Sequence, residues 1–165
     1  MAYDSRALTG VNGWLAFFVL TLAVFTPFGV LTNRYVDLFG SPATAAAFGD
    51  RWVVMQAASG SIGAATIALS WYMAWRLMKV QQWQTVRIVV GGLFVIAIMP
   101  SLLDIIAVSI IAGLPLSRIA DLVDVQTVRP LIYATVWTAY LLRSERVANT
   151  YDRYPDETEL AEVFE

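Results

Sequence analysis

The sequence predicts an all-α polytopic membrane protein, a bundle of four transmembrane helices, from three observations. Of its 165 residues, 58% are hydrophobic and 15% are charged, whereas soluble domains average about 45–50% apolar and about 25% charged residues. The mean hydropathy is +0.62. The apolar residues also form long blocks, since neither Ala7 to Asn33 nor Trp52 to Trp75 contains a charged side chain. Each block exceeds the roughly 18 residues that mark a membrane-span candidate.

Four helices of spanning length follow from these blocks, at about 1.5 Å per residue across a core of about 30 Å. We expect them at Trp14 to Leu31, Trp52 to Leu77, Arg87 to Ala112 and Val125 to Leu142. Arg129 and Pro130 lie in the first turns of the fourth helix. Because proline is tolerated there, they indicate an interfacial start. The four helices make up a predicted transmembrane domain, residues 1–151, followed by an acidic cytoplasmic tail, residues 152–165.

The basic residues predict the orientation, because cytoplasmic loops are enriched in Lys and Arg. With both termini inside, the inner side holds Arg6, Arg76, Lys79, Arg87, Arg143, Arg146 and Arg153, and the outer side holds Arg34, Arg51, Arg118 and Arg129. The excess favours an N-in, C-in topology. The first apolar block is too long for the core of a cleavable signal peptide and is interpreted as a retained anchor.

The two outer loops carry apolar residues as well as turn formers. In the first loop, Thr32 to Arg51, Ser41 and Pro42 are expected to open a short Ala-rich helix that ends at Ala47. In the second, Gly113 to Asp124, the spacing of the leucines predicts a short helix capped by Ser117. The first loop is expected to lie in the headgroup region or to cover the bundle, and the second helix is expected to lie in the membrane interface.

The residue inventory excludes most catalytic chemistry. The chain has no Cys and no His, which removes thiol nucleophiles, Cys/His zinc sites, imidazole-ligated haem and Ser-His-Asp triads. A formal net charge of -2 gives no basic footprint for nucleic acid. We therefore predict no catalytic residues, no metal and no cofactor. A lipid-modifying enzyme is disfavoured for the same reason.

Asp104 is the only carboxylate deep inside a predicted span, and ionisable residues there are candidate functional sites. Arg129 enters the fourth helix from the same side, so the two side chains are predicted to meet. The favoured interpretation is an ion pair that locks the third helix to the fourth. A proton or ion relay is the alternative, although relays use chains of titratable groups. Pro100, one turn before Asp104, is expected to bend the third helix.

Small residues crowd one part of the second predicted helix. Ala57 with Ser61, and Gly60 with Ala64, form two small-xxx-small pairs that allow close approach of another helix. Gly91 and Gly92 of the third helix are a candidate complementary notch. Packing within the chain is the favoured interpretation, and packing against another membrane protein is the alternative.

The tail after Tyr151 is strongly acidic and is expected to avoid anionic lipid. Leu160, Val163 and Phe164 share one face of a helix that would begin near Asp156. The simple interpretation is a frayed tail, because so short a helix is marginal in water. The alternative is a docking peptide for a cytoplasmic partner.

Two stretches carry a family resemblance. Gly10-Val11-Asn12-Gly13-Trp14-Leu15 resembles the "G-x-x-G-W-L" opening of the DUF2569 family, small four-span proteins of bacterial inner membranes. Trp137, Tyr140 and the run from Arg143-Ser144 through Arg146 to Thr150-Tyr151 are similar to that family's closing motif. Glu145 departs from the Lys usual at its position. The resemblance implies four spans and a cytoplasmic closing motif, but no activity.

Beyond the fourth helix, Arg143, Ser144, Arg146 and Thr150 are predicted to contact lipid headgroups, since arginine side chains can reach phosphates from helix ends. The function predicted overall is that of a non-catalytic integral membrane accessory subunit or assembly factor. Its partners would be membrane lipids and a larger membrane complex, with no nucleic acid. The alternative is a small oligomeric transporter or channel that uses Asp104 and Arg129.

Overall fold

The computed structural model describes residues 9–40, 45–46, 49–112 and 125–152, and every regular element in these ranges is helical. The elements, in chain order, are α1 (Trp14–Leu20), the π-helical turn η2 (Thr21–Phe25), α2 (Thr26–Phe39), the 3-10 turn η3 (Gly49–Arg51), α4 (Trp52–Lys79), α5 (Trp83–Ala112), α7 (Val125–Arg143) and α8 (Glu145–Thr150). The predicted all-α class is confirmed for this part of the chain.

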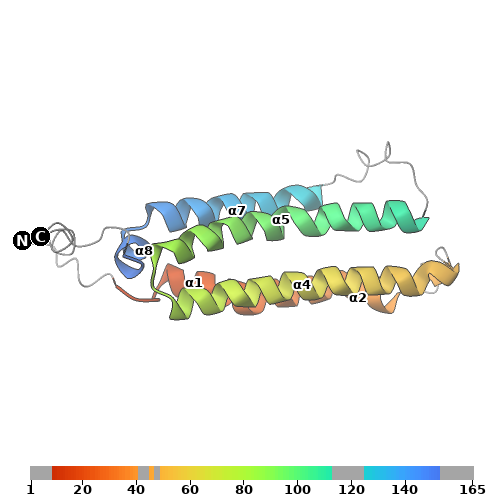
Figure 1. Ribbon diagram of the computed structural model, residues 1–165, viewed down its shortest axis with the longest axis horizontal. Coiled ribbons are helices and arrows are strands. Elements are labelled where there is room, and N and C mark those ends of the chain that lie inside the picture. The colour runs from red at the N-terminus through yellow and green to blue at the C-terminus, as the bar shows by residue number, and fades with distance from the viewer. Residues whose placement is uncertain (1–8, 41–44, 47–48, 113–124, 153–165) are drawn as a thin grey trace, which may run out of the picture.

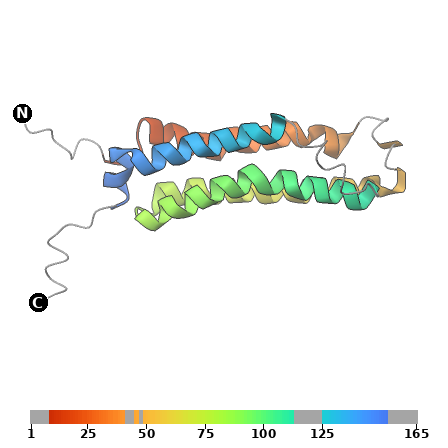
Figure 2. The ribbon, with the colours of Figure 1, turned by 90° about the horizontal axis from the view of Figure 1, so that it is seen from above.

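The long helices form an elongated antiparallel bundle (Figure 1). Helix α1 continues through η2 into α2 as one rod, α4 packs against both α2 and α5, and α5 packs against α7. Seen from above, α7 overlies the α1–α2 rod and α5 overlies α4 (Figure 2). The end that carries α8 and the start of α1 is called the α8 end below. The opposite end, with η3 and the last turn of α5, is called the far end.

The observed helices extend beyond several predicted bounds. The second and fourth helices end two residues and one residue later than expected, and the third begins at Trp83 instead of Arg87. The first differs most, because it continues to Phe39 instead of ending at Leu31. Thr32 to Phe39, expected in a loop, are therefore helical. This stretch contains Arg34, which contacts Asp104. The Ala-rich helix expected up to Ala47 lies largely outside the described residues, as does the one expected within 113–124.

The π-helical turn η2 interrupts the regular hydrogen bonding of the first rod. The Thr26 N–H donates to the Thr21 carbonyl five residues back, where an α-helix would bond four residues back. A neighbouring helix supplies hydrogen bonds to two carbonyls within this turn. Ser70 of α4 donates to the Leu22 carbonyl, and the Trp71 indole Nε1 donates to the Ala23 carbonyl over 2.9 Å.

Helix α7 also contacts this irregular turn. The hydroxyls of Thr21 and Tyr133 lie 2.8 Å apart, and Phe18 stacks on Trp137 with ring centroids 4.5 Å apart. These contacts join the first and last long helices towards the α8 end, where the core is largest. The core consists of Leu15, Phe18, Val19, Leu22, Met73, Ala74, Leu77, Val86, Val89, Leu93, Ala97, Ala134, Leu141, Val147 and Tyr151.

Much of the apolar surface faces outward. Phe28 is 66% exposed and Ile110 75% exposed. Three described stretches, Trp14–Tyr35, Gly49–Lys79 and Trp83–Ile111, are long and apolar enough to cross a membrane. Together these features indicate a multi-pass membrane protein. Helix α7, which contains Gln126, Arg129 and Pro130, is less apolar than these three stretches.

The α4–α5 contact depends on a glycine. A Cβ atom added at Gly92 would lie 2.3 Å from the sulfur of Met73, which is fully buried. A Cβ added at Gly91, one position earlier, would have no neighbour within 4 Å. Of the two predicted notch residues, Gly92 therefore lies against α4 and Gly91 does not.

We expect Gly92→Leu to lower the stability of the bundle by about 1–3 kcal/mol, because overpacking forces side chains off their preferred conformations. Gly91→Leu is the matched control and should change stability by less than about 0.5 kcal/mol. Thermal unfolding of the two detergent-purified variants measures the difference. Equal stability of the two variants would contradict the packing described for α4 and α5.

Candidate functional site

The strongest polar contact in the described bundle joins Arg34 of α2 to Asp104 of α5. Arg34 Nη1 lies 2.6 Å from Asp104 Oδ1, and Nη2 donates to Oδ2 over 2.7 Å, so the contact is bidentate. Arg34 Nη1 also donates to the Ser59 hydroxyl of α4 over 3.1 Å. Bidentate arginine–carboxylate contacts combine charge with fixed geometry. This cluster therefore ties three helices together near the far end.

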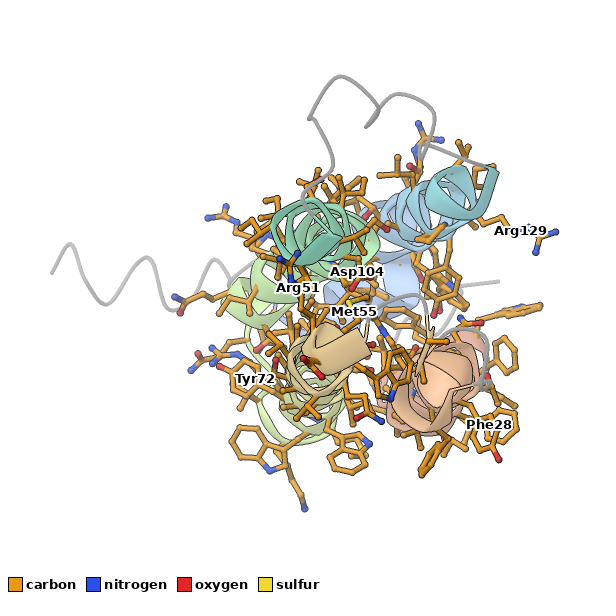
Figure 3. The ribbon with its side chains drawn as sticks, turned by 90° about the vertical axis from the view of Figure 1, so that its right-hand side faces the viewer. Phe28, Arg51, Met55, Tyr72, Asp104 and Arg129 are labelled. Atoms are coloured by element: carbon orange, nitrogen blue, oxygen red, sulfur yellow. The ribbon has the colours of Figure 1, made fainter. Side chains whose placement is uncertain are left out.

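Asp104 was predicted to pair with Arg129, and this prediction is wrong about the partner. The Arg34 side chain is only 12% exposed and that of Asp104 31% exposed, whereas Arg129 is an exposed residue. Figure 3 shows Asp104 inside the bundle and Arg129 on its outer edge. The cause is the longer first helix, because α2 carries Arg34 past the predicted helix end and onto the inner face.

A cavity of about 830 Å³ adjoins this ion pair. Its lining comes from all four rods. The first rod contributes from Phe17 to Arg34, α5 from Ile96 to Asp104, α7 contributes Pro130 and Tyr133, and α4 contributes Thr66. Asp104 and Pro100, both singled out from the sequence, thus lie on one cavity wall. No local sequence pattern indicates this cavity, because its walls come from segments far apart in the chain.

A second cluster lies at the α8 end and joins the two ends of the described chain. The Gly10 N–H donates to the Thr150 hydroxyl over 3.0 Å, and that hydroxyl donates to the Arg146 carbonyl over 2.7 Å. The Tyr151 hydroxyl donates to the Leu77 carbonyl over 2.6 Å. We call Gly10, Leu77, Thr150 and Tyr151 the clasp.

Backbone geometry and helix chemistry explain the residue types in the clasp and beside it. Gly10 has φ +86° and Gly13 has φ +59°, values that residues with a side chain rarely adopt. Leu77 lies in the last turn of α4, where carbonyls have no partner within the helix. Tyr151, which is fully buried, supplies that partner. Burial in this apolar site raises the pKa of the Tyr151 hydroxyl above its ordinary value, so the donor stays protonated.

The clasp brings together the glycine-rich opening and the closing motif of the chain, which lie at opposite ends of the sequence. A family model described as "Protein of unknown function (DUF2569)" matches residues 8–151. The chain belongs to the DUF2569 family. No curated protein and no solved structure shows a significant match to it.

Membership covers nearly all of the chain, so the DUF2569 motifs have a structural explanation in this member. The two motif glycines allow the entry into α1. The motif threonine fastens that entry to α8, and the motif tyrosine fastens the end of α8 to α4. Of the residues predicted to contact lipid headgroups, Thr150 is buried and bonded within the protein. Arg143 is exposed, and Ser144 and Arg146 are half-buried.

The predicted small-residue face of α4 lies mostly on the outer surface of the bundle. Ala57, Ser61 and Ala64 are exposed and Gly60 is half-buried. The face that α4 turns inward is a different one, formed by Met55, Ser59, Gly63, Thr66, Ser70, Met73, Ala74 and Leu77. Ser59 and Gly63 are themselves a small-xxx-small pair, so close packing within the chain uses this pair. The predicted docking residues Leu160, Val163 and Phe164 lie outside the described residues.

Asp104→Asn should destabilise the protein by about 3 kcal/mol, because it leaves the Arg34 charge without its carboxylate. Removing one partner of a buried ion pair typically costs about 3–5 kcal/mol of stability. Arg129→Gln should have little effect, since Arg129 is exposed. Thermal unfolding in detergent compares the two variants. If Arg129→Gln lowers stability as much as Asp104→Asn does, the assignment of Arg34 as the ion-pair partner of Asp104 fails.

Tyr151→Phe keeps the ring and removes the hydroxyl that bonds to Leu77, which should cost about 1–3 kcal/mol because a buried carbonyl loses its donor. The pKa of Tyr151 is higher in the fold than in the unfolded chain, so its contribution is complete below about pH 10, the ordinary tyrosine pKa, and declines as the pH rises further. The deficit of Tyr151→Phe should therefore shrink above pH 10. Urea unfolding at pH 8 and pH 11 measures it, and a constant deficit would contradict this account.

Proposed function

We propose that this DUF2569 protein is a non-catalytic accessory subunit or assembly factor that packs against a larger complex in the bacterial inner membrane. The observation that carries the proposal is a strip of small side chains on the outer face of α4. Its members, Ala57, Ser61, Ala64, Ala65 and Ala68, are all exposed. Faces that meet only lipid have no need of small residues, whereas helix–helix contacts in membranes are enriched in them.

The proposal includes four membrane crossings, with α7 as the fourth. Helix α7 packs along α5 and joins the apolar core through Ala134 and Leu141, which supports a crossing parallel to the other rods. Exposed Ile132 and Val136 give it an apolar outer surface. Helix α7 begins short of the far end (Figure 1), and its exposed Arg129 lies in the second turn from that start.

We further propose that both termini face the cytoplasm. Five basic residues lie at the α8 end, namely Arg76, Lys79, Arg87, Arg143 and Arg146. Two basic residues at the far end make contacts within the protein, since Arg34 pairs with Asp104 and Arg51 donates to the Ile111 carbonyl over 2.6 Å. Discounting these two strengthens the excess of loop charges at the α8 end, and such an excess is typical of the cytoplasmic side.

The Arg34–Asp104 contact supports a structural role in preference to a relay. Both oxygens of Asp104 accept hydrogen bonds from Arg34, and Ser59 fixes the same guanidinium from a third helix. A carboxylate held in this way ties helices together, while a relay requires groups that exchange protons in sequence.

A small transporter or channel is the second candidate, and the cavity next to Asp104 favours it. The sequence predicts a polar pair of Asp104 with Arg129 for this role, but Asp104 pairs with Arg34, so a transport path would use Arg34 and Asp104. Ion flux through liposomes that contain only this purified protein would decide for the transporter.

The small-residue strip gives a direct test of the accessory role. Ala64→Leu should abolish co-purification of a stoichiometric larger membrane protein in mild detergent, because a leucine holds the partner helix away. Ala139→Leu is the matched control, since Ala139 is also exposed but lies on α7. Blue-native electrophoresis with mass spectrometry measures the retained complex.

Retention of the partner by Ala64→Leu, or a wild-type chain that purifies without a larger partner, would contradict the proposal. Because the chain has no cysteine, Ser61→Cys labelled with a photo-crosslinker can map the contact without interfering thiols. The crosslinked peptide is expected to come from an apolar helix of the partner.

A further inference from the structure

The cavity described above has the dimensions of a ligand site for a long molecule. Its volume of about 830 Å³ falls within the roughly 300–1,000 Å³ of small-molecule pockets. Its lining runs from Phe17 to Arg34 along the first rod, which by helical rise is about 25 Å. That length is most of a hydrocarbon core about 30 Å thick.

The cavity lies where the first rod and α7 face each other. The first rod packs along α4, and α7 packs along α5. The first rod and α7 therefore form the two sides of the cavity. Viewed from the far end, α2 and α7 lie on the same side of the bundle, with Asp104 further in (Figure 3). A molecule in the surrounding lipid would therefore enter sideways, between α2 and α7.

A departure from regular helix geometry and two prolines line this one cavity. Thr21 and Phe25 belong to the π-helical turn η2, Pro100 lies inside α5, and Pro130 lies in the first turns of α7. Inserted π turns occur frequently at functional sites. Four hydrogen-bonding groups, two carbonyls of the turn and the side chains of Ser70 and Trp71, are committed to holding it.

The two ends of the cavity differ in chemistry. Towards the α8 end its walls are mostly apolar, with Phe17, Phe25, Val30, Ile96 and Ala97. Thr26 also lines this part, and the lining hydroxyls of Thr21, Thr66 and Tyr133 are hydrogen-bonded within the protein. Towards the far end they are polar, with Asn33, Arg34, Ser101 and Asp104. The arginine and the aspartate neutralise each other, so this polar end has both signs of charge and no net charge.

The polar end of the cavity also lies close to the far end of the bundle. Arg34 is five residues before the end of α2 and Asp104 eight residues before the end of α5. By helical rise these positions are about 8 and 12 Å inside the far end of the bundle. A chain-bearing molecule with its head at this level would extend its chain along the apolar walls.

We propose that this cavity binds one zwitterionic phospholipid, with an acyl chain along the apolar wall and the headgroup at Arg34 and Asp104. The phosphate lies nearest the guanidinium and the ammonium nearest the carboxylate, because each then faces the opposite charge. The inference rests on the proposed membrane crossing of the four rods, but not on the accessory-subunit role.

Two glycines give a matched pair of variants for the test. Gly29 lines the cavity, and Gly91 does not. A Cβ at either position would have no neighbour within 4 Å, so the first side-chain atom clashes with nothing at either position. Gly29→Trp fills the cavity, and Gly91→Trp adds the same side chain to an exposed part of α5.

The measurement is native mass spectrometry of the full chain released from nanodiscs with equal amounts of dioleoyl phosphatidylethanolamine and dioleoyl phosphatidylglycerol. The wild-type chain and Gly91→Trp are expected to retain one phosphatidylethanolamine each, and Gly29→Trp at least about tenfold less. Asp104→Asn should shift the preference towards phosphatidylglycerol, because the polar end then gains a net positive charge. Arg34→Gln should shift it away from phosphatidylglycerol.

Equal retention by Gly29→Trp and Gly91→Trp would overturn the site, and so would equal retention of the two lipids by the wild-type chain. If Asp104→Asn does not fold, the preference of Arg34→Gln and the two glycine variants still decide the question. Loss of partner binding in Ala64→Leu with lipid retention intact leaves this site standing, so failure of the accessory role and failure of the lipid site are distinguishable.

Discussion

Backbone carbonyls inside a membrane must find hydrogen bonds within the protein, because hydrocarbon offers none. In this bundle, side chains from other elements supply several of them. The Leu22 and Ala23 carbonyls of the π turn accept from Ser70 and Trp71 of α4. At helix ends, the Leu77 carbonyl accepts from Tyr151, and the Ile111 carbonyl accepts from Arg51.

This requirement connects the parts of the molecule that otherwise look unrelated. The clasp caps the end of α4 and fastens α8 at the same time, so one tyrosine serves both purposes. The Arg34–Asp104 contact does the same for charge, since it joins α2 to α5 without leaving a net charge between the helices. The contacts of α4 within the bundle come from its inner face. The small residues on its outer face are therefore the part of α4 that can contact another membrane protein.

The sequence was sufficient for the helices and insufficient for their contacts. Apolar runs between charged residues located all four long helices, because the alternation of apolar and charged stretches is a local property. The end of the first helix was missed because the predicted loop began at Thr32 and included the charged Arg34, yet in the fold the Asp104 carboxylate compensates that charge. That compensation comes from a residue far along the chain and is invisible to a local pattern.

The small-residue face illustrates the same limit. Helical spacing identified Ala57, Gly60, Ser61 and Ala64 as a possible contact surface, and an equivalent pair, Ser59 and Gly63, lies on the inner face of the same helix. Spacing alone does not say which face turns inward, since that depends on α2 and α5. The clasp was anticipated only as two motifs at opposite ends, and the hydrogen bond between them required the fold.

The bond between Gly10 and Thr150 also has a consequence for biosynthesis. Its two partners are separated by nearly the whole chain, and ribosomes add about 5–20 residues per second. For on the order of ten seconds, the first helix must therefore reside in the translocon or the lipid without its final anchor. The entry to α1 is fastened only after α8 has been made, and a nascent chain that stalls before α8 emerges leaves this entry unfastened.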